Sequence, residues 1–394
     1  MLIEFKVTNF RSIRETQKLS LAATSSTELE KNLFSSGIDG LPPLAKSAVI
    51  YGPNAAGKSN LVQAIDFLQN FVKNSAKESQ GGEPIDVIPF LLDEKSKNSP
   101  TEFEVMFITK GMLYEYGFAL TKKCVTHEWL FAYPEGKAQK WFERFYESEN
   151  QTWFLNKEYL KGQCQLWQDS TRANALFLST AVMLNSVSLK PILEWMTQTL
   201  VIFQERRLPH TIQQCEEITK KQKIMAFLQT ADLGIADIRL DKNTSISFVH
   251  ISSDKQKEVL FPENYESAGT LKLFALAGPL LEILEQGQIL IVDEMDSSIH
   301  PMMMRFIIGI IHNPELNKHG TQMIFTTHDS STLDNTLLRP DQVWFIEKDN
   351  AQATQLYPLT DFIPRQNESL QKGYLDGRYG ALPCLSELNF DENS

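Results

Sequence analysis

The feature that most constrains this chain is a glycine-rich motif that runs Gly52-Pro53-Asn54-Ala55-Ala56-Gly57-Lys58-Ser59. It matches the pattern G-x-x-x-x-G-K-[ST], in which the glycines let successive backbone N–H groups turn toward one concavity. The apolar residues 48–51 before it predict a short buried strand, and residues 60–68 after it have helical apolar spacing. In such a strand–loop–helix unit Lys58 reaches the β- and γ-phosphates and Ser59 holds Mg²⁺. The sequence therefore predicts a site for a nucleoside triphosphate.

A second motif lies more than 230 residues later. Four apolar residues, 289–292, are followed by Asp293 and Glu294. Continuous apolar runs are typical of buried parallel strands, and the carboxyl end of such a strand is where α/β sheets place their ligands. Asp293 is then a candidate Mg²⁺ ligand, and Glu294 a candidate for polarising the attacking water. Alone, such a run is as compatible with an ordinary strand end. After a phosphate loop it indicates hydrolysis of ATP or GTP.

Two further segments flank the Asp-Glu pair. Ser267 and Gly269 open an apolar helix 26 residues before Asp293, and small polar residues at a helix start make a second anion site. His328 follows the apolar residues 323–325, 35 residues after Asp293. The alternatives are an ordinary helix cap for Ser267 and Gly269, and an ordinary strand-end histidine for His328.

This order of motifs resembles the ABC-type ATPase heads of the SMC and RecF group. The resemblance implies that Ser267 and Gly269 are signature residues that touch the γ-phosphate bound to another subunit. It implies that His328 is the switch histidine, so the catalytic group is Glu294, His328 and Lys58. Ala268 replaces a family glycine, and residues 295–298 match a dimer-contact loop.

The opening segment 7–13 matches the family's "NFRS" strand, in which the arginine, here Arg11, lies near the nucleotide. A solvated charge is the alternative for Arg11. The family's glutamine loop has no clear counterpart, because residues 89–93 occupy its region without a glutamine. The resemblance implies ATP and Mg²⁺ as cofactors, with Ser59 and Asp293 on the metal. The implied nucleotide contacts are Gly52, Asn54, Ala55, Ala56, Gly57, Lys58, Ser59, Asn60, Arg11, Ser267 and Gly269.

The tail gives a narrower resemblance. Residues 373–383 are similar to the C-terminal Y-x-x-G-R-Y-G-x-x-P segment of compact bacterial ATPases, which include the RloA and AbiL types and the AriA subunit of PARIS systems. The E-S-x-G-T run at 266–270 is typical of the same group. These relatives imply anti-phage defence beside a separately encoded effector, a nuclease or toxin. The alternative for the tail is a glycine-rich turn that covers the sheet edge.

Charge and composition limit the other functions. The net charge is −11 with a pI near 5.3, so nothing global favours nucleic acid, which is bound largely through Lys and Arg. The local basic residues Arg206, Arg207, Lys220, Lys221 and Lys223 are expected on solvated helix faces, although an oligomer could line a channel with them. The four cysteines show no C-x-x-C spacing and suggest a reducing compartment. The absence of a signal peptide and of an apolar run of about 18 residues predicts a cytoplasmic protein without a membrane span.

The predicted fold class is α/β, a P-loop ABC-type head with a mixed central sheet, an antiparallel β subdomain and a compact helical insert. Residues 1–150 form the N-terminal lobe, 151–235 the helical insert or lid, and 236–394 the C-terminal lobe with a frayed end at 391–394. The predicted activity is ATP hydrolysis in a head-to-tail homodimer, or higher oligomer, that controls the effector. A RecF-like DNA-repair clamp and an ATP-gated scaffold with little turnover remain the alternatives.

Overall fold

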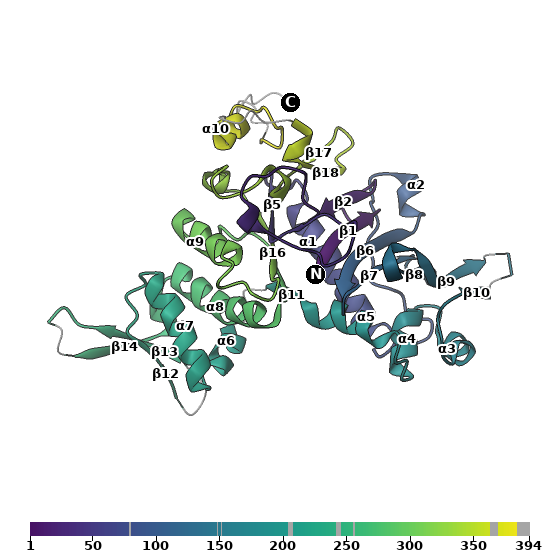
Figure 1. Ribbon diagram of the computed structural model, residues 1–394, viewed down its shortest axis with the longest axis horizontal. Helices are drawn as coiled ribbons and strands as arrows, with labels where there is room; N and C mark the ends of the chain where they lie inside the picture. The colour runs from purple at the N-terminus through teal and green to yellow at the C-terminus, as the bar shows by residue number, and fades with distance from the viewer. Residues whose placement is uncertain are drawn as a thin grey trace, which may run out of the picture.

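The computed structural model describes residues 1–78, 80–147, 149–150, 152–203, 208–241, 246–254, 257–362 and 369–383. Arg206, Arg207, Cys384 and the 391–394 end lie outside the described residues. Two large sheets lie side by side with helix α1 (Lys58–Asn74) between them, as Figure 1 shows. Both sheets are needed to bury this helix, because its apolar face contacts residues of both.

The first sheet is antiparallel throughout and has the strand order β10-β9-β8-β7-β6-β1-β2. It confirms the predicted antiparallel β subdomain. Its strands are β1 (Leu2–Thr8), β2 (Gln17–Ser20), β6 (Thr101–Thr109), β7 (Met112–Leu120), β8 (Val125–Ala132), β9 (Gln139–Glu147) and β10 (Thr152–Lys157). Beside it lie the two-stranded sheet of β3 (Leu33–Phe34) and β4 (Leu44–Ala45) and the short helix α2 (Glu94–Lys97).

The second sheet has the order β11-β15-β16-β5-β17-β18 and is parallel except for β18, so the predicted mixed central sheet is confirmed. Strand β5 lies in its middle, between β16 and β17. The predicted strands at 48–51 and 289–292 are two of its members. Its strands are β5 (Ser47–Tyr51), β11 (Leu200–Phe203), β15 (Ile289–Val292), β16 (Gln322–Thr327), β17 (Val343–Lys348) and β18 (Thr354–Pro358).

The buried strands of this sheet contribute side chains to two hydrophobic cores, one on each face. Both faces are therefore apolar, which explains the continuous apolar runs in the sequence. Ala48 and Ile50 of β5 pack toward α1 and the first sheet. Val49 and Tyr51 face the other core, which α7 (Ile218–Thr230), α8 (Ala268–Gln286) and α9 (Pro301–His312) cover. Burial of one such aliphatic side chain contributes about 1.5–3 kcal/mol. Packing on both faces therefore fixes the position of the central strands.

The segment predicted to be helical contains α3 (Cys164–Ser170), α4 (Phe177–Met183), α5 (Lys190–Glu194), the π-helical turn η3 (Trp195–Thr199), α6 (Leu208–Gln214) and α7. It also contains β10 and β11. The helical structure expected over residues 151–235 is interrupted at Leu200, because Leu200 pairs with Ile289 at the edge of the central sheet. A three-stranded sheet of β12 (Asp237–Leu240), β13 (Ile246–Ile251) and β14 (Glu258–Pro262), not expected from the sequence, projects at the left of Figure 1.

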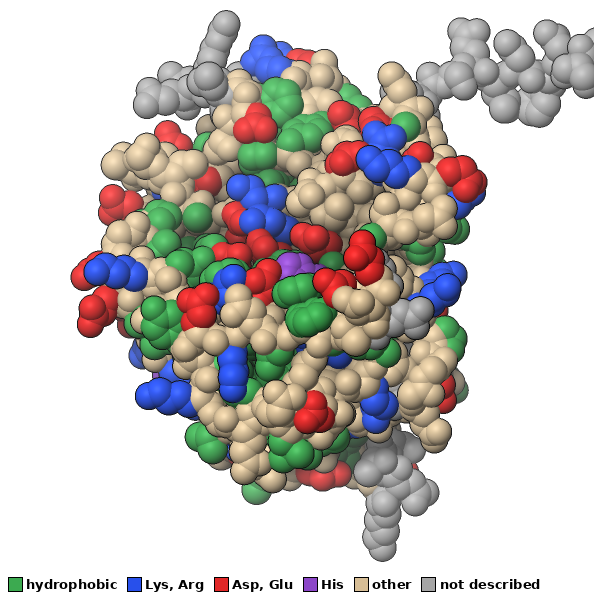
Figure 2. All heavy atoms as spheres, turned by 90° about the vertical axis from the view of Figure 1, so that its right-hand side faces the viewer, with side chains coloured by type: hydrophobic (Ala, Val, Ile, Leu, Met, Phe, Trp, Pro, Cys, Tyr) green, Lys and Arg blue, Asp and Glu red, His purple; other side chains and the backbone are tan. Residues whose placement is uncertain are grey.

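The surface mixes charges of both signs. On the face shown in Figure 2, Lys and Arg side chains are scattered among acidic and apolar ones, and acidic side chains gather near the centre of the view. Within the described residues, no helix has both the length and the apolar character needed to cross a membrane.

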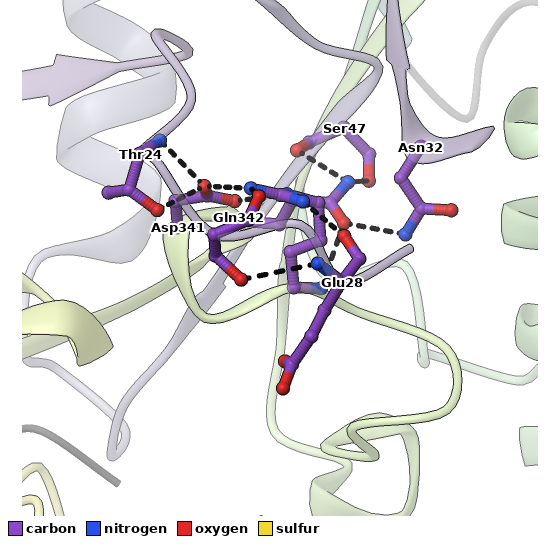
Figure 3. Close-up of polar contacts among 8 residues, drawn as sticks. Thr24, Glu28, Asn32, Ser47, Asp341 and Gln342 are labelled. Atoms are coloured by element: carbon purple, nitrogen blue, oxygen red, sulfur yellow. Dashed lines mark hydrogen bonds and ion pairs between the residues drawn. The ribbon is translucent and has the colours of Figure 1, made fainter. Parts of the chain in front are cut away.

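A buried polar strap ties the N-terminal segment to the central sheet (Figure 3). Arg339 is fully buried, and its guanidinium donates to Asp341 and to the main-chain carbonyls of Ser26 and Glu28. Asp341 also accepts two hydrogen bonds from Thr24, each 2.8 Å long. Gln342 reaches across to the start of β5. A buried charge without partners is costly, so this full set of partners is what permits Arg339 inside the molecule.

Candidate active site

The site lies at the carboxyl ends of three neighbouring parallel strands. The phosphate loop follows β5, the Asp293–Glu294 pair follows β15, and His328 follows β16. The register aligns these ends, because Val292 pairs with Phe325 and Thr327 with Tyr51. Loops after adjacent parallel strands meet at one edge of the sheet, where α/β proteins bind ligands.

The three loops surround one hollow of about 190 Å³. Lys58 and His328 face each other across it, although they are 270 residues apart in the chain. The predicted phosphate-loop residues thus lie with the predicted water-activating glutamate and switch histidine. The lining residues are Asn54, Ala55, Ala56, Gly57, Lys58, Ser59, Asn60, Glu294 and His328.

Both motif glycines are required by their neighbours as well as by the turn. A Cβ on Gly52 would lie 2.2 Å from the Ile346 carbonyl oxygen. Gly57 has a φ of 116°, and a Cβ there would lie 2.2 Å from Thr354 Oγ1. Strands β17 and β18 therefore press directly on the loop. Any side chain at either position would displace the loop backbone.

Lys58 is buried and its ammonium is held by the loop itself. Its Nζ donates to the carbonyl oxygens of Gly52 at 2.7 Å and Pro53 at 2.9 Å, and lies 3.3 Å from His328 Nδ1. Burial lowers the pKa of Lys58, while the charges of Asp293 and its acidic neighbours act in the opposite direction. A polyphosphate in the hollow would favour the charged form further.

Thr326, at the end of β16, was not identified from the sequence, yet it organises the Asp-Glu pair. Its hydroxyl donates to Asp293 Oδ1 at 2.6 Å and accepts the Glu294 N–H at 2.8 Å. The side chain is fully buried. In the sequence, Thr326 is marked only by its position just before Thr327 and His328. Its contact with the Asp-Glu pair becomes apparent only when β16 is known to lie beside β15. Thr326 fixes the direction of the Asp293 carboxylate.

The donor set fits Mg²⁺ and a triphosphate. Hydroxyl and carboxylate oxygens, as on Ser59 and Asp293, are ligands that Mg²⁺ prefers. The start of α1 directs its N–H groups into the loop. In addition, Asp296 Oδ1 is buried and has no hydrogen-bond partner among the described residues, while its Oδ2 accepts the His328 N–H at 3.1 Å.

The opening segment reaches the site through Ser12 rather than Arg11. Ser12 Oγ accepts from Asn60 Nδ2 at 2.6 Å and lies 2.7 Å from Thr354 Oγ1, which bonds the Ala56 carbonyl. Arg11 is exposed, its guanidinium lies over the Phe10 ring, and it does not line the hollow. Within one chain Arg11 therefore does not reach the hollow, and its contact with the nucleotide stays a prediction.

The predicted signature residues lie outside the hollow. Ser267 is the N-cap of α8 and accepts from the Thr270 N–H at 3.0 Å, and it is exposed. A Cβ on Gly269 would lie 2.6 Å from the Ser298 carbonyl oxygen. Within one chain, then, the start of α8 packs on the loop after Glu294 and not on the phosphate loop. The helix-cap alternative describes what Ser267 does inside a single chain.

The tail packs against the far side of the same sheet edge. Its helix α10 (Leu370–Leu375) and the following turn place Tyr374 and Tyr379 on Phe345, with ring centroids 5.4 and 5.6 Å from it. Tyr374 also contacts Tyr51, the residue before the phosphate loop. Arg378 is exposed. The tail thus covers the sheet near β17, as its alternative interpretation expects, and Arg378 lies at its surface.

Three comparisons relate this chain to known proteins. Residues 47–334 match the family described as "AAA domain, putative AbiEii toxin, Type IV TA system". No curated protein matches the chain. Among solved structures, an SMC head domain from Thermotoga maritima is similar with 15% identity and a TM-score of 0.45, over 91% of this chain and 98% of that one.

Two further solved structures are similar at the same distant level. An Smc head bound to the C-winged helix domain of ScpA has 12% identity and a TM-score of 0.46, over 91% of this chain and 97% of that one. An Smc head domain with an extended coiled coil, bound to the C-terminal domain of ScpA derived from Pyrococcus furiosus, has 12% identity and a TM-score of 0.39. That similarity covers 96% of this chain and 98% of that one.

Proposed function

This chain belongs to the AAA-domain family that its residues 47–334 match, and from that premise we propose that it hydrolyses ATP at a site completed by a second copy of itself. The observation that carries the proposal is the convergence of three motifs on one hollow. Phosphoryl transfer depends mainly on positioning and on charge stabilisation, and the hollow supplies groups for both.

Each residue has a role that follows from its place. The backbone N–H groups of the phosphate loop and Lys58 bind the phosphate oxygens. Ser59 and Asp293 hold Mg²⁺, which when bound neutralises charge on the phosphates. Glu294, exposed at the mouth of the hollow, orients a water and accepts its proton. His328, opposite Lys58, donates toward the γ-phosphate.

The second chain is invoked because Ser267 is exposed and both signature residues stand apart from the hollow. Ser267 and Gly269 lie at the start of α8, whose N–H groups and partial positive charge suit an anion. A head-to-tail partner would bring its own α8 start to the γ-phosphate. Loss of one such donor toward developing charge costs about 10²–10³ in rate.

The direct test is steady-state ATP hydrolysis. We expect Lys58→Ala to abolish it, and Glu294→Gln to keep ATP binding while slowing hydrolysis by about 10²-fold or more. The glutamine variant should also accumulate as an ATP-dependent dimer in size measurements. Wild-type turnover by either variant would remove the assignment of this hollow as an ATPase site.

The composite nature of the site has its own test. Ser267→Arg should bind ATP but hydrolyse it poorly, because the bulky cation blocks closure of the dimer. Mixed with Lys58→Ala, it should regain activity, since one site of a mixed dimer combines an intact phosphate loop with an intact signature. If no mixture exceeds either parent, and wild-type specific activity does not fall on dilution, each chain carries a complete site.

We propose control of a separately encoded effector, a nuclease or toxin, as the output of the ATP cycle. The support is the description of the matched family, which names a toxin and a toxin–antitoxin system, together with the exposed Arg378 in a tail outside the hollow. The product of the neighbouring gene should co-purify with Glu294→Gln in ATP and dissociate from Lys58→Ala. Equal recovery on both variants would separate the ATP cycle from the effector.

The structure does not favour DNA as the partner. Lys220, Lys221 and Lys223 in α7 each form an ion pair with a carboxylate, at 2.8, 2.7 and 2.5 Å. A nucleic-acid phosphate would therefore have to compete with these carboxylates for each lysine. With the net charge of −11, the described residues give no observation that supports a DNA clamp.

A further inference from the structure

A buried lysine connects the signature helix to the water-activating glutamate. Lys272 lies five residues after Ser267 in α8, is only 8% exposed, and donates from Nζ to the Glu294 carbonyl oxygen at 2.8 Å. Taking an ammonium out of water is costly unless hydrogen bonds compensate. An apolar side chain at this helix position would be buried without this desolvation cost. The presence of a lysine here therefore needs an explanation other than packing.

The group that receives this hydrogen bond is itself unusual. Glu294 has a φ of 48°, in the left-handed region that residues other than glycine seldom adopt. Its N–H is held by Thr326 Oγ1 at 2.8 Å, and its C=O by Lys272. Both backbone groups are thus fixed from opposite sides, one by β16 and one by α8. Together they set the direction in which the Glu294 side chain leaves the strand.

A second contact joins the start of α8 to the loop that follows Glu294. Gly269 lies so close to the Ser298 carbonyl that a Cβ would be 2.6 Å from its oxygen. The start of α8 therefore cannot shift without displacing the loop 294–298. A movement at Ser267 would reach Glu294 by two routes, through this packing and through the Lys272 hydrogen bond.

We propose that Lys272 is a positioning residue, which holds Glu294 of its own chain in the water-activating orientation and links it to the signature helix. The inference rests on the proposed function, in which Ser267 of the same helix engages the nucleotide of the other chain.

The first experiment separates positioning from binding. Lys272→Met should lower kcat about 10-fold or more, which corresponds to about 1.4 kcal/mol, with KM and the affinity for ATP changed less than about twofold. Lys272→Arg, which can still donate to the carbonyl, should recover part of kcat. The matched control is Lys46→Met, because Lys46 is also buried and donates to main-chain carbonyls, but at the opposite end of β5. It should lose stability and keep kcat.

The second experiment asks whether Lys272 acts through Glu294. In the Glu294→Gln background, Lys272→Met should add no further loss, because the group that it positions no longer accepts a proton. An equal fold-loss in both backgrounds would overturn the inference. So would a Lys272→Met variant that loses kcat only in proportion to its loss of folded protein, as judged against Lys46→Met by thermal unfolding.

The third experiment decides in which chain Lys272 acts. If it holds Glu294 of its own chain, a mixture of Lys272→Met with Ser267→Arg should exceed both parents, and a mixture with Lys58→Ala should not. If Lys272 instead served the partner's nucleotide with Ser267, the two mixtures would give the reverse result and the inference would fall. Failure of the Ser267→Arg and Lys58→Ala mixture to complement would instead contradict the composite site of the proposed function.

Discussion

Replacing Thr326 by valine is the sharpest single test of how the Asp-Glu pair is held. The change keeps the β-branched shape of a fully buried side chain and removes only the hydroxyl. That hydroxyl donates to the Asp293 carboxylate at 2.6 Å and accepts the Glu294 N–H at 2.8 Å. Thr326→Val therefore removes two hydrogen bonds without opening a cavity.

The size of the effect follows from these two contacts. A hydrogen bond to a charged group contributes about 1.5–3 kcal/mol, and an unpaired N–H near the surface costs about 1 kcal/mol. We expect Thr326→Val to lower the free energy of unfolding by about 2.5–4 kcal/mol, a large share of the 5–15 kcal/mol typical of a folded protein. If about 1.4 kcal/mol of this oriented Asp293 for the metal, the Mg²⁺ concentration for half-maximal hydrolysis should rise about tenfold.

Urea unfolding and a Mg²⁺ titration of ATP hydrolysis measure the two quantities. Thr321→Val is the matched control, because Thr321 is equally buried just before β16 and its hydroxyl donates to the Ile283 carbonyl at 2.7 Å, at the far end of the strand. It should lose about 1 kcal/mol of stability and keep its Mg²⁺ dependence. If Thr326→Val shifts the Mg²⁺ dependence no more than Thr321→Val does, the bridging hydroxyl does not position Asp293.

Three further outcomes are expected. Gly269→Ala should bind ATP but hydrolyse it poorly, since its Cβ would meet the Ser298 carbonyl at 2.6 Å; unchanged turnover would show that the loop yields freely. Arg378→Ala should leave basal hydrolysis within a few-fold while weakening self-association or effector binding; a collapse of hydrolysis with unchanged assembly would place the tail in the active site. Burial lowers the pKa of His312 to about 3, whereas the same histidine in the unfolded chain has a pKa of about 6.5. As the pH falls below about 6.5, the unfolded chain therefore takes up a proton that the folded chain does not. The stability contributed by neutral His312 is complete above about pH 6.5 and is lost as the pH falls toward 3. The stability advantage of wild type over His312→Gln, measured by urea unfolding, should therefore shrink by up to about 1.4 kcal/mol per pH unit below pH 6; a constant difference would contradict it.

The elements that the sequence predicted are those encoded by local patterns. The phosphate loop, its strand and its helix are continuous in the chain, and the Asp-Glu pair follows an apolar run, so neither depends on tertiary contacts for recognition. The convergence of His328 on Lys58 could be expected only through the resemblance. The roles of these residues in hydrolysis stay predictions until the variants above are assayed.

The residues that the sequence did not predict act through register between distant segments. Thr326 and Lys272 matter because β16 lies beside β15 and because α8 crosses the loop after Glu294. Neither relation is visible in spacing along the chain. Strand β11 lies within the insert predicted to be helical over residues 151–235, and pairing of Leu200 with Ile289 overrides that preference. The strands β12–β14 are only 4 to 6 residues long, and the apolar run Val259-Leu260-Phe261 of β14 lacks the alternation that marks a half-buried strand.

The position of β5 in the central sheet has a consequence for how this protein is made. Its five buried residues are synthesised long before both of its neighbours, because β16 and β17 begin only at Gln322 and Val343. At about 5–20 residues per second, a ribosome needs on the order of 15–50 s to cover that distance. During this time the nascent chain carries an apolar strand whose edges have no partners, which is the kind of segment that associates with other chains. The nucleotide-binding edge can therefore assemble only after β16 and β17 have been synthesised, and a chaperone that shields β5 on the ribosome should raise the yield of active protein.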